Sequence, residues 1–398
     1  MEDVIVIGGG PAGSAAAALL ARCGCRVLLL DRAAFPREKP CGDYLNPGCD
    51  AVLARLGARG AVAAAGARPV RGMRVVPPGA AGITFPFSRG AGWTLTRRML
   101  DGLLLAHAGA AGARTVQQAR VIGVEHDGGG VRVGVERPGL RRATYRARIV
   151  IGADGLHSTV ARALGLGGPP LRGRYTVGAY LEGLVPGDES AAREIGEVHL
   201  RPDCYCGVAY LPGGLANVTI ALSRDALRTW RGALDARYWA ALRTFPDLAG
   251  RLEGARRRET FRTSGPLGYW RRRAVSGQVL LVGDAAAYID PLTGQGIYLA
   301  LRGAELAAAA ALTALAPGGA AADLRGYDRA RRREFGPIFL VSRILQHLAF
   351  SPLAVRRAAR QLAARPELGT RLIGVVGNME PAADVLRPAF VARMLGIA

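Results

Sequence analysis

Three glycines near the N-terminus have the spacing of a phosphate-binding turn. Gly8, Gly10 and Gly13 form a G-x-G-x-x-G pattern between the apolar run 3–7 and an Ala-rich segment. In a strand–turn–helix unit, such glycines permit a tight turn, close approach of a pyrophosphate and close packing of the helix on the strand. The helix N-terminus then offers free N–H groups to the phosphates. Asp31 ends the next apolar run and can accept hydrogen bonds from a ribose, so the unit predicts a dinucleotide site.

Two more segments place an aspartate after an apolar run. The run 280–283 is followed by Asp284 and then by the Gly-rich turn 290–297, which opens a helical segment. The run 149–152 is followed by Asp154. Backbone N–H groups at the start of a helix stabilise negative charge, which is what a reduced cofactor would need. Asp154 can contact a bound cofactor or serve only as a helix N-cap, and both roles remain open.

These segments resemble the p-hydroxybenzoate hydroxylase-like superfamily of FAD-dependent oxidoreductases, and they are most similar to its geranylgeranyl reductase-like branch. The resemblance implies that Asp284 bonds the ribityl chain of FAD and that the turn 290–297 brings N–H groups to the flavin pyrimidine edge. It also implies that Asp154 contacts the ribityl region and helps to shape a groove for NAD(P)H. The segment 39–47, K-P-C-G-D-Y-L-N-P, is similar to the K-x-C-G-x-x-L-x-P segment of the same branch.

The chain departs from that branch over the expected substrate pocket. Residues 207–218 resemble its strand pair, but Val208 and Tyr210 stand within a segment that is typically G-x-x-W-x-F-P in relatives, and the Trp is missing. The sequence therefore predicts a hydrophobic small-molecule substrate without specifying a prenyl group. Arg97 and Asp101 fit an R-x-x-x-D segment whose Arg approaches the FAD phosphates in relatives, with a surface arginine as the alternative.

The expected site residues follow from the G-x-G-x-x-G pattern and the family resemblance together. Cys41 and Tyr210 are the catalytic candidates, and a buried structural thiol is the alternative for Cys41. Lys39 is the only lysine in the chain, and an exposed side chain is the alternative to a cofactor contact. The expected FAD-binding residues are Gly8, Gly10, Pro11, Ala12, Gly13, Asp31, Arg32, Lys39, Cys41, Gly42, Arg97, Val121, Asp154, Gly155, Asp284, Pro291, Gly294, Gly296 and Ile297.

Apolar periodicity predicts a mixed α/β (α+β) fold that would position these residues. We expect a Rossmann-like FAD-binding domain, a substrate domain with an antiparallel sheet, and a C-terminal helical region. The FAD-binding domain is assigned to 1–70, 93–170 and 259–322, the substrate domain to 71–92 and 171–258, and a helical cap to 323–398. In the cap, helices are expected to break at prolines, namely Pro337, Pro352, Pro366, Pro381 and Pro388.

Composition narrows the class of partner. The net charge is +22, yet arginines are spread along the chain and no aromatic–basic stripe indicates nucleic-acid binding. No histidine or cysteine spacing indicates a metal site. No basic segment precedes the first apolar run, so we expect a cytoplasmic protein without a signal peptide. The Ala-rich run near 304–322 is expected to be a buried helix, and the Arg-rich segment 355–364 a cap over the flavin domain rather than a membrane-bound helix.

The sequence leaves the reaction open between two routes. We favour an NAD(P)H-dependent monooxygenase acting on a hydrophobic, natural-product-like molecule, because such chemistry needs a dry pocket and no obligatory acid–base residue. Reduction or oxidation of a carbon–carbon bond is placed second. A flavin halogenase ranks below these because the W-x-W-x-I-P segment is absent, and a non-catalytic prenyl-binding escort would not need Asp284 and the turn 290–297 intact. The oligomeric state is not predicted.

Overall fold

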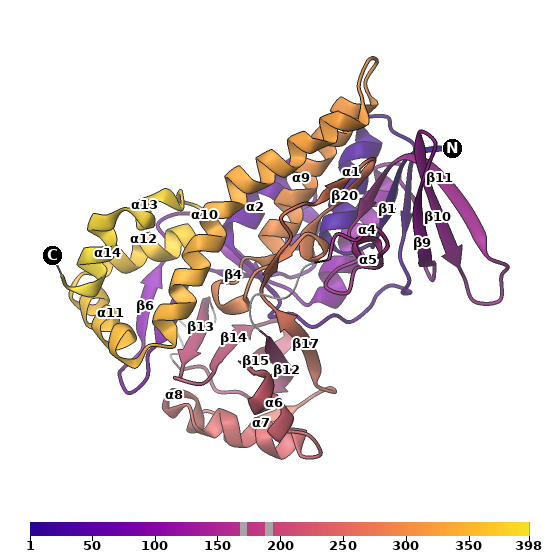
Figure 1. Cartoon of the computed structure of the whole chain (residues 1–398). Coiled ribbons are helices and arrows are strands. Elements are labelled where there is room, and N and C mark those ends of the chain that lie inside the picture. The colour runs from indigo at the N-terminus through magenta and orange to yellow at the C-terminus, as the bar shows by residue number, and fades with distance from the viewer. Residues whose placement is uncertain (168–172, 188–193, 398) are drawn as a thin grey trace.

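The computed structural model describes residues 1–167, 173–187 and 194–397, which form three regions (Figure 1). A mainly parallel sheet with its helices contains the N-terminus. A second, mainly antiparallel sheet lies beneath it in the view of Figure 1, and helices from the C-terminal quarter gather at the left. The mixed α/β class expected from the sequence is confirmed.

The apolar runs near the N-terminus form the centre of the first sheet. Its strand order is β19-β20-β11-β1-β2-β8, and all neighbours are parallel except β19 and β20. The last four residues of β1 and all of β2 are buried, which explains their uninterrupted apolar sequences. The strands are β1 (Glu2–Ile7), β2 (Val27–Leu30), β8 (Arg114–Val116), β11 (Ala143–Gly152), β19 (Val275–Ser276) and β20 (Val279–Leu281).

Small side chains let two helices pack closely beside this sheet. Helix α1 (Pro11–Arg22) buries an unbroken run of alanines, and α9 (Gly296–Leu315) buries alanines at helical spacing. Both contribute to the largest hydrophobic core, together with α2 (Pro47–Leu56) and α4 (Arg97–Ala110). Helix α9 is long and apolar enough to cross a membrane, but more than half of it is buried inside the protein. The buried Ala-rich helix expected near 304–322 therefore corresponds to α9, which begins and ends earlier.

Short elements complete the region around the first sheet. Strands β9 and β10 form a ribbon that continues into β11 and projects to the right in Figure 1. The elements are α3 (Arg59–Ala64), α5 (Thr159–Ala163), β3 (Tyr44–Leu45), β4 (Arg68–Val70), β7 (Gly92–Thr94), β9 (Arg120–Asp127), β10 (Gly130–Glu136), β18 (Tyr269–Trp270) and β21 (Ala287–Tyr288).

The second sheet has the order β16-β12-β15-β14-β13-β5-β6, with β17 also paired to β12. Its neighbours are antiparallel except β5 and β13, which run parallel. Three helices cover one face, where Tyr238 and Leu242 pack on alternate residues of β15. The elements are β5 (Gly72–Val76), β6 (Ile83–Pro86), β12 (Arg174–Glu182), β13 (Ile195–Leu200), β14 (Tyr205–Tyr210), β15 (Leu215–Ser223), β16 (Arg256–Arg257), β17 (Arg262–Leu267), α6 (Arg224–Thr229), α7 (Leu234–Arg243) and α8 (Pro246–Ala249).

The sheet pairing corrects one expected domain boundary. We assigned the chain after 258 to the nucleotide-binding domain, yet β17 pairs with β12 in the second sheet. The chain returns to the first sheet only at β19. Sequence pattern missed this because β17 contains Gly265 and Pro266 and lacks a clear alternation of apolar residues.

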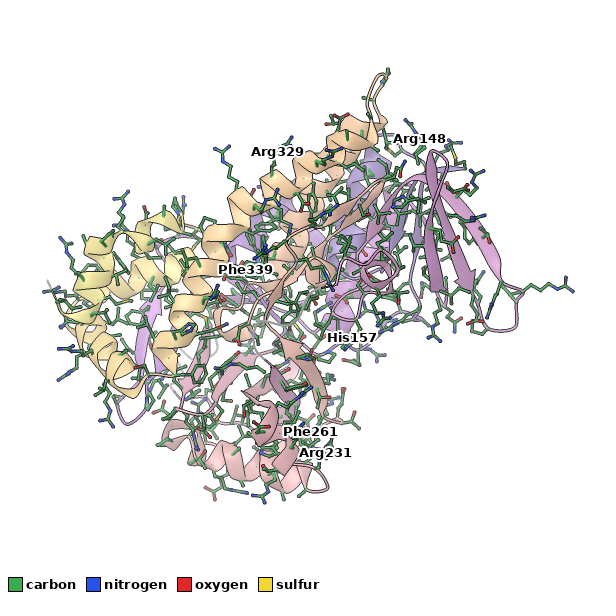
Figure 2. The ribbon with its side chains drawn as sticks, viewed as in Figure 1. Arg148, His157, Arg231, Phe261, Arg329 and Phe339 are labelled. Carbon is green, nitrogen blue, oxygen red and sulfur yellow. The ribbon has the colours of Figure 1, made fainter. Side chains whose placement is uncertain are left out.

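The C-terminal region is helical as expected, but Pro337 does not break a helix. It lies inside α10. Phe335, Ile338 and Phe339 pack against Leu299 of α9, and this packing maintains the helix through the proline. Phe339, labelled in Figure 2, also contacts the Trp270 ring edge-on at a centroid distance of 4.6 Å. The helices are α10 (Arg325–Ala349), α11 (Pro352–Ala364), α12 (Pro366–Val376), α13 (Ala383–Leu386) and α14 (Pro388–Leu395).

Candidate active site

The N-terminal turn can be formed only by glycine at two of its positions. Gly8 has φ +107°, and a Cβ there would overlap the Ala153 carbonyl. A Cβ on Gly13 would overlap the Gly8 carbonyl, because α1 passes directly against the end of β1. The Ser14 hydroxyl donates to the Gly9 carbonyl at 3.0 Å and holds the turn on the helix. The structure thus forms the turn that the spacing predicts.

Asp31 fixes the same turn from the end of β2. Its carboxylate is buried and accepts hydrogen bonds from the N–H groups of Gly9 at 2.6 Å and Ala33 at 2.7 Å. Two other expected residues make no polar contact with the turn in the described part of the chain. Arg32 is exposed, and Val121 lies in β9 within the hydrophobic core.

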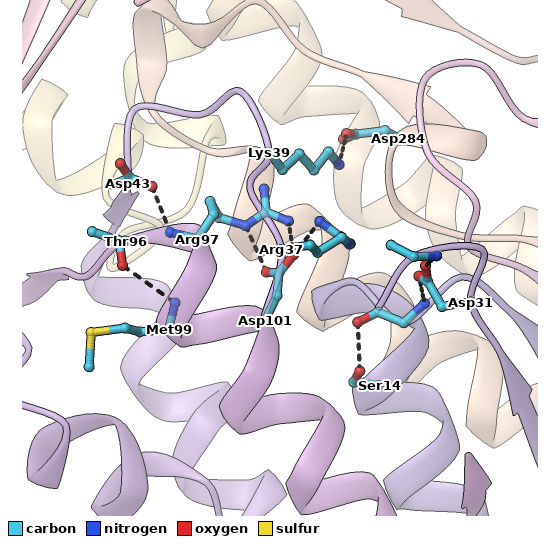
Figure 3. A network of polar contacts seen from close by, with 12 residues as sticks. Ser14, Asp31, Arg37, Lys39, Asp43, Thr96, Arg97, Met99, Asp101 and Asp284 are labelled. Carbon is cyan, nitrogen blue, oxygen red and sulfur yellow. Dashed lines mark hydrogen bonds and ion pairs between the residues drawn. The ribbon is translucent and has the colours of Figure 1, made fainter. Parts of the chain in front are cut away.

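Two arginines lie over the open side of the turn. A Cβ built on Gly10 would be 3.5 Å from Arg37 Nη2 and 4.0 Å from Arg97 Nη2. Arg97 is 4% exposed and donates from Nε and Nη2 to the two oxygens of Asp101, at 2.7 and 2.8 Å, while Arg37 Nη1 lies 3.0 Å from Asp101 Oδ2 (Figure 3). Both cations remain near the N-terminus of α1, where a pyrophosphate would lie. Arg97 is therefore not a surface side chain. Sequence reasoning missed Arg37, since nothing distinguishes it among so many arginines.

Lys39 lies in the groove beyond these arginines. Its Nζ is 3.1 Å from Asp284 Oδ2, and a Cβ built on Gly155 would be 3.8 Å from the same nitrogen (Figure 3). The only lysine thus connects the two segments that resemblance places beside the ribityl chain. The exposed alternative for Lys39 is wrong, because its side chain is two-thirds covered.

Asp154 has the capping role that the sequence allowed, and the structure leaves its second oxygen available for the other. Its Oδ2 accepts hydrogen bonds from the N–H groups of Thr159 at 2.7 Å and Val160 at 3.2 Å, at the start of α5. Its Oδ1 is buried and has no hydrogen-bond partner among the described residues. One oxygen therefore holds the helix start and the other keeps its acceptor capacity.

The turn before α9 presents backbone rather than side chains to the groove. Gly294 has φ +62°, and a Cβ there would lie 2.8 Å from the Tyr44 ring. Pro291, Gly294, Gly296 and Ile297 all line one cavity together with Asp284, Gly10 and Gly42. The helix that begins at Gly296 directs its free N–H groups toward this side of the turn.

The cavity continues from these residues into an apolar chamber between the second sheet and the C-terminal helices. Its far walls come from strands β5, β6 and β13 and from helices α10, α11 and α12, and include Val75, Phe85, Leu200, Leu348, Leu362 and Ile373. Cys41 lines the cavity near its junction with the groove. Burial raises the pKa of the Cys41 thiol, so the thiol keeps its proton at neutral pH.

Tyr210, the other catalytic candidate, does not line this cavity. Its hydroxyl donates to Glu197 Oε1 at 2.8 Å and contacts Arg251. His199 Nε2 lies 2.8 Å from Glu197 Oε2, and Arg251 bonds both carboxylate oxygens at 2.9 and 3.0 Å. Burial acts to raise the pKa of Glu197, but the bonds from His199 and Arg251 outweigh it and lower this pKa to about 2. Tyr210 thus belongs to a buried ion-pair cluster that stabilises the sheet.

Together these residues satisfy the requirements of an FAD site. The glycine turn, Arg37 and Arg97 suit a pyrophosphate, and the groove at Lys39 and Asp284 suits a polyol chain. The unpartnered Oδ1 of Asp154 supplies an acceptor in the same region. Among residues 1–167, 173–187 and 194–397, no cluster of three or more His, Cys, Asp or Glu side chains could hold a metal ion.

Comparison with known proteins agrees with this geometry. Residues 1–185 match the FAD binding domain family. The chain is 31% identical to menaquinone reductase of Mycolicibacterium smegmatis, over 100% of this chain and 96% of that protein. It is 30% identical to digeranylgeranylglycerophospholipid reductase 1 of Methanothermobacter thermautotrophicus, covering 84% and 83%. The solved myxobacterial chondrochloren halogenase, an FAD-dependent enzyme, is 27% identical with a TM-score of 0.80, covering 86% and 82%.

Proposed function

Because this chain belongs to the family of FAD-dependent oxidoreductases that includes these menaquinone and digeranylgeranylglycerophospholipid reductases, we propose that it reduces a carbon–carbon double bond in a long apolar substrate. The two relatives are named for substrates that carry isoprenoid chains. A chain of this kind is the substrate class that we assign to the apolar chamber.

The shape of the cavity is the observation that carries this proposal. It connects the FAD groove at Asp284 and Gly294 with walls from the second sheet and from α10, α11 and α12. Apolar side chains dominate its far end, so a hydrocarbon chain would gain free energy by leaving water there. The groove end would hold the double bond beside the flavin. A compact polar substrate would leave the apolar walls without a function.

The chain's own residues can supply the second requirement of the reaction, a proton. Reduced FAD held in this groove would supply the hydride for one alkene carbon, and a proton must form the C–H bond at the other. The Cys41 thiol is protonated and lines the cavity, so we assign it as the proton donor. The resulting thiolate would regain a proton from water, and NAD(P)H is the reductant that restores reduced FAD.

Monooxygenation, favoured from the sequence alone, becomes the second candidate. It is retained because the chamber is apolar, and oxygen transfer needs a dry site without an acid–base residue. The order is reversed because the five relatives at 30% identity or more given by the comparison are all named as reductases. The two reactions give products of different mass, which makes them easy to separate.

The deciding experiment supplies NADPH and a menaquinone or geranylgeranyl lipid to the FAD-loaded protein, with and without oxygen. Reduction of the double bond predicts an anaerobic product that gains two hydrogens and keeps them after reoxidation in air, which distinguishes it from a product reduced only at a quinone ring. A product that requires oxygen and gains one oxygen atom would contradict reduction and support monooxygenation.

Matched cysteine variants test the proton donor. Cys41→Ala should slow product formation about tenfold or more, the scale of a lost general acid, while leaving flavin reduction by NADPH unchanged. Cys49→Ala is the control, since Cys49 is buried in α2 and does not line the cavity. Equal rates for both variants would remove Cys41 from the mechanism.

A further inference from the structure

Two buried tyrosine–aspartate hydrogen bonds connect the second sheet to the two loops that line the FAD groove. The first loop comprises residues 39–43 and the second comprises residues 290–296. We propose that Tyr180 with Asp43 and Tyr205 with Asp290 are positioning residues that fix these loops relative to the sheet, and so set where a substrate lies against the flavin.

The first pair joins β12 to the end of the first loop. The Tyr180 hydroxyl donates to Asp43 Oδ2 at 2.6 Å, and Asn217 Nδ2 of β15 donates to the same oxygen at 2.7 Å. Asp43 Oδ1 accepts from the Arg97 N–H at 2.8 Å, at the first turn of α4. Asp43 is 1% exposed and has φ +54°, a conformation that non-glycine residues rarely adopt. These contacts therefore hold Asp43 between the two sheets.

The same contacts extend to the cavity wall. Asn217 Nδ2 also donates to the Cys41 carbonyl at 2.7 Å, and Asn217 Oδ1 accepts from the Thr219 hydroxyl at 2.8 Å. Cys41, Asn217 and Thr219 line the cavity, whereas Asp43 lies behind them. The carboxylate thus acts on the cavity through the residues that it holds and not by direct contact.

The second pair makes a similar bond on the other side of the groove, where Tyr205 itself lines the cavity. The Tyr205 hydroxyl of β14 donates to Asp290 Oδ1 at 2.6 Å, and the Leu292 N–H donates to the same oxygen at 3.1 Å. Arg174 Nε of β12 lies 3.7 Å from Asp290 Oδ2. Asp290 is 4% exposed, so its loop is held to the second sheet by a buried carboxylate.

The two loops also contact each other. The Tyr44 ring, directly after the first loop, packs against Gly294 so closely that a Cβ there would lie 2.8 Å from it. Neither loop can move far without disturbing the other. A shift of the second sheet would pull on both through Tyr180 and Tyr205, which couples the substrate wall to the FAD groove.

The test compares Tyr180→Phe and Tyr205→Phe with Tyr238→Phe. Tyr238 is a matched control because it is fully buried in the same region and its hydroxyl makes one hydrogen bond, to the Val218 carbonyl at 2.8 Å, on the face away from the cavity. The protein is loaded with FAD. The readouts are the absorption and fluorescence of the flavin and the rate of Cys41 alkylation, followed by peptide mass spectrometry.

All three variants should lose thermal stability, because each loses one buried hydrogen bond, and the loss should be smallest for Tyr238→Phe, whose bond is to a neutral carbonyl. Only Tyr180→Phe and Tyr205→Phe should change the flavin spectrum, and Tyr180→Phe should make Cys41 alkylation about tenfold faster, the factor for one bond to a buried carboxylate. Spectra and alkylation rates that match Tyr238→Phe would overturn the inference. Both readouts are independent of substrate turnover, so they decide the inference even if no alkene is reduced.

Discussion

The dinucleotide turn and the apolar chamber differ in which atoms form their walls. At the turn, backbone groups form the wall. The Ala153 carbonyl excludes a side chain at Gly8, and the Gly8 carbonyl excludes one at Gly13. In the chamber, side chains from strands of the second sheet and from three helices meet from distant parts of the chain. A backbone-built site tolerates little change, whereas a side-chain wall can change its shape residue by residue. This difference predicts where substitution abolishes the fold and where it only alters specificity.

The largest effect is expected at the turn. Gly13→Ala would force a Cβ into the Gly8 carbonyl and against the Ala153 Cβ at 3.1 Å, so we expect a loss of about 3 kcal/mol in unfolding free energy and loss of bound FAD. Gly102→Ala is the control, because Gly102 lies in α4 with no atom near the added Cβ. The unfolding free energy of this variant should be unchanged or higher by about 0.5–1 kcal/mol. Thermal unfolding and flavin absorbance measure both. A Gly13→Ala protein that retains FAD would contradict a backbone-built site.

The buried cluster around Glu197, which is itself part of the cavity wall, should give the next largest effect. Glu197→Gln leaves the Arg251 guanidinium without its charged partner, at a cost of about 3 kcal/mol at pH 7. The pKa of Glu197 is lowered in the fold to about 2, so its stabilisation is complete above the unfolded value of 4.5 and is lost as the pH falls toward 2.

Denaturation curves from pH 7 to pH 3 test this dependence. The difference between wild type and Glu197→Gln should stay constant down to about pH 5 and then shrink. Glu125→Gln is the control, since that side chain is 70% exposed and its pair with Arg132 should contribute little. If the difference in unfolding free energy grew on acidification, the pKa of Glu197 would be raised in the fold and not lowered. Flavin bound per folded molecule should remain unchanged, in contrast to the turn.

A substitution in the chamber should alter specificity and leave the cofactor in place. Ala358→Trp, on the inner side of α11, would fill part of the chamber, and we expect KM for a long-chain substrate to rise about tenfold with FAD affinity unchanged. Ala363→Trp is the control, because Ala363 is exposed on the same helix. Steady-state kinetics with substrates of two chain lengths measure the effect. An equal rise for short and long chains would place the substrate elsewhere.

The contrast between a wall of backbone groups and a wall of side chains also explains which parts of the site the sequence alone could predict. Gly8, Gly13 and Asp284 were predictable because glycine at a tight turn and aspartate after a buried strand act within a few residues of the chain. The chamber was not, because its walls converge through tertiary packing that no local pattern records. Tyr210 was misassigned for this reason: its place in the strand was predicted, but the partner that holds its hydroxyl, Glu197, lies on a neighbouring strand.

Long-range packing also accounts for the errors in the elements. Pro337 is an effective helix breaker in isolation, yet the contacts of Phe335 and Ile338 with α9 maintain α10 through it. The boundary at 259 failed because β17 is held in the second sheet by pairing with β12 and not by its own apolar pattern. In each case a contact between distant segments outweighed the local preference.

The smallest effect is expected on FAD affinity, at two arginines whose roles in cofactor binding the sequence could not distinguish. Arg37 lies over Gly10, whereas Arg32 is exposed beyond the turn. Arg37→Ala should weaken FAD binding about tenfold by removing a charged hydrogen bond to the pyrophosphate, and Arg32→Ala should leave it unchanged. The fold should persist in Arg37→Ala because Asp101 keeps both bonds from Arg97. Titration of the apoprotein with FAD at two salt concentrations checks this: only Arg37→Ala should lose part of the salt dependence, and equal effects of both variants would mean that general positive charge, not the geometry at Gly10, attracts the cofactor.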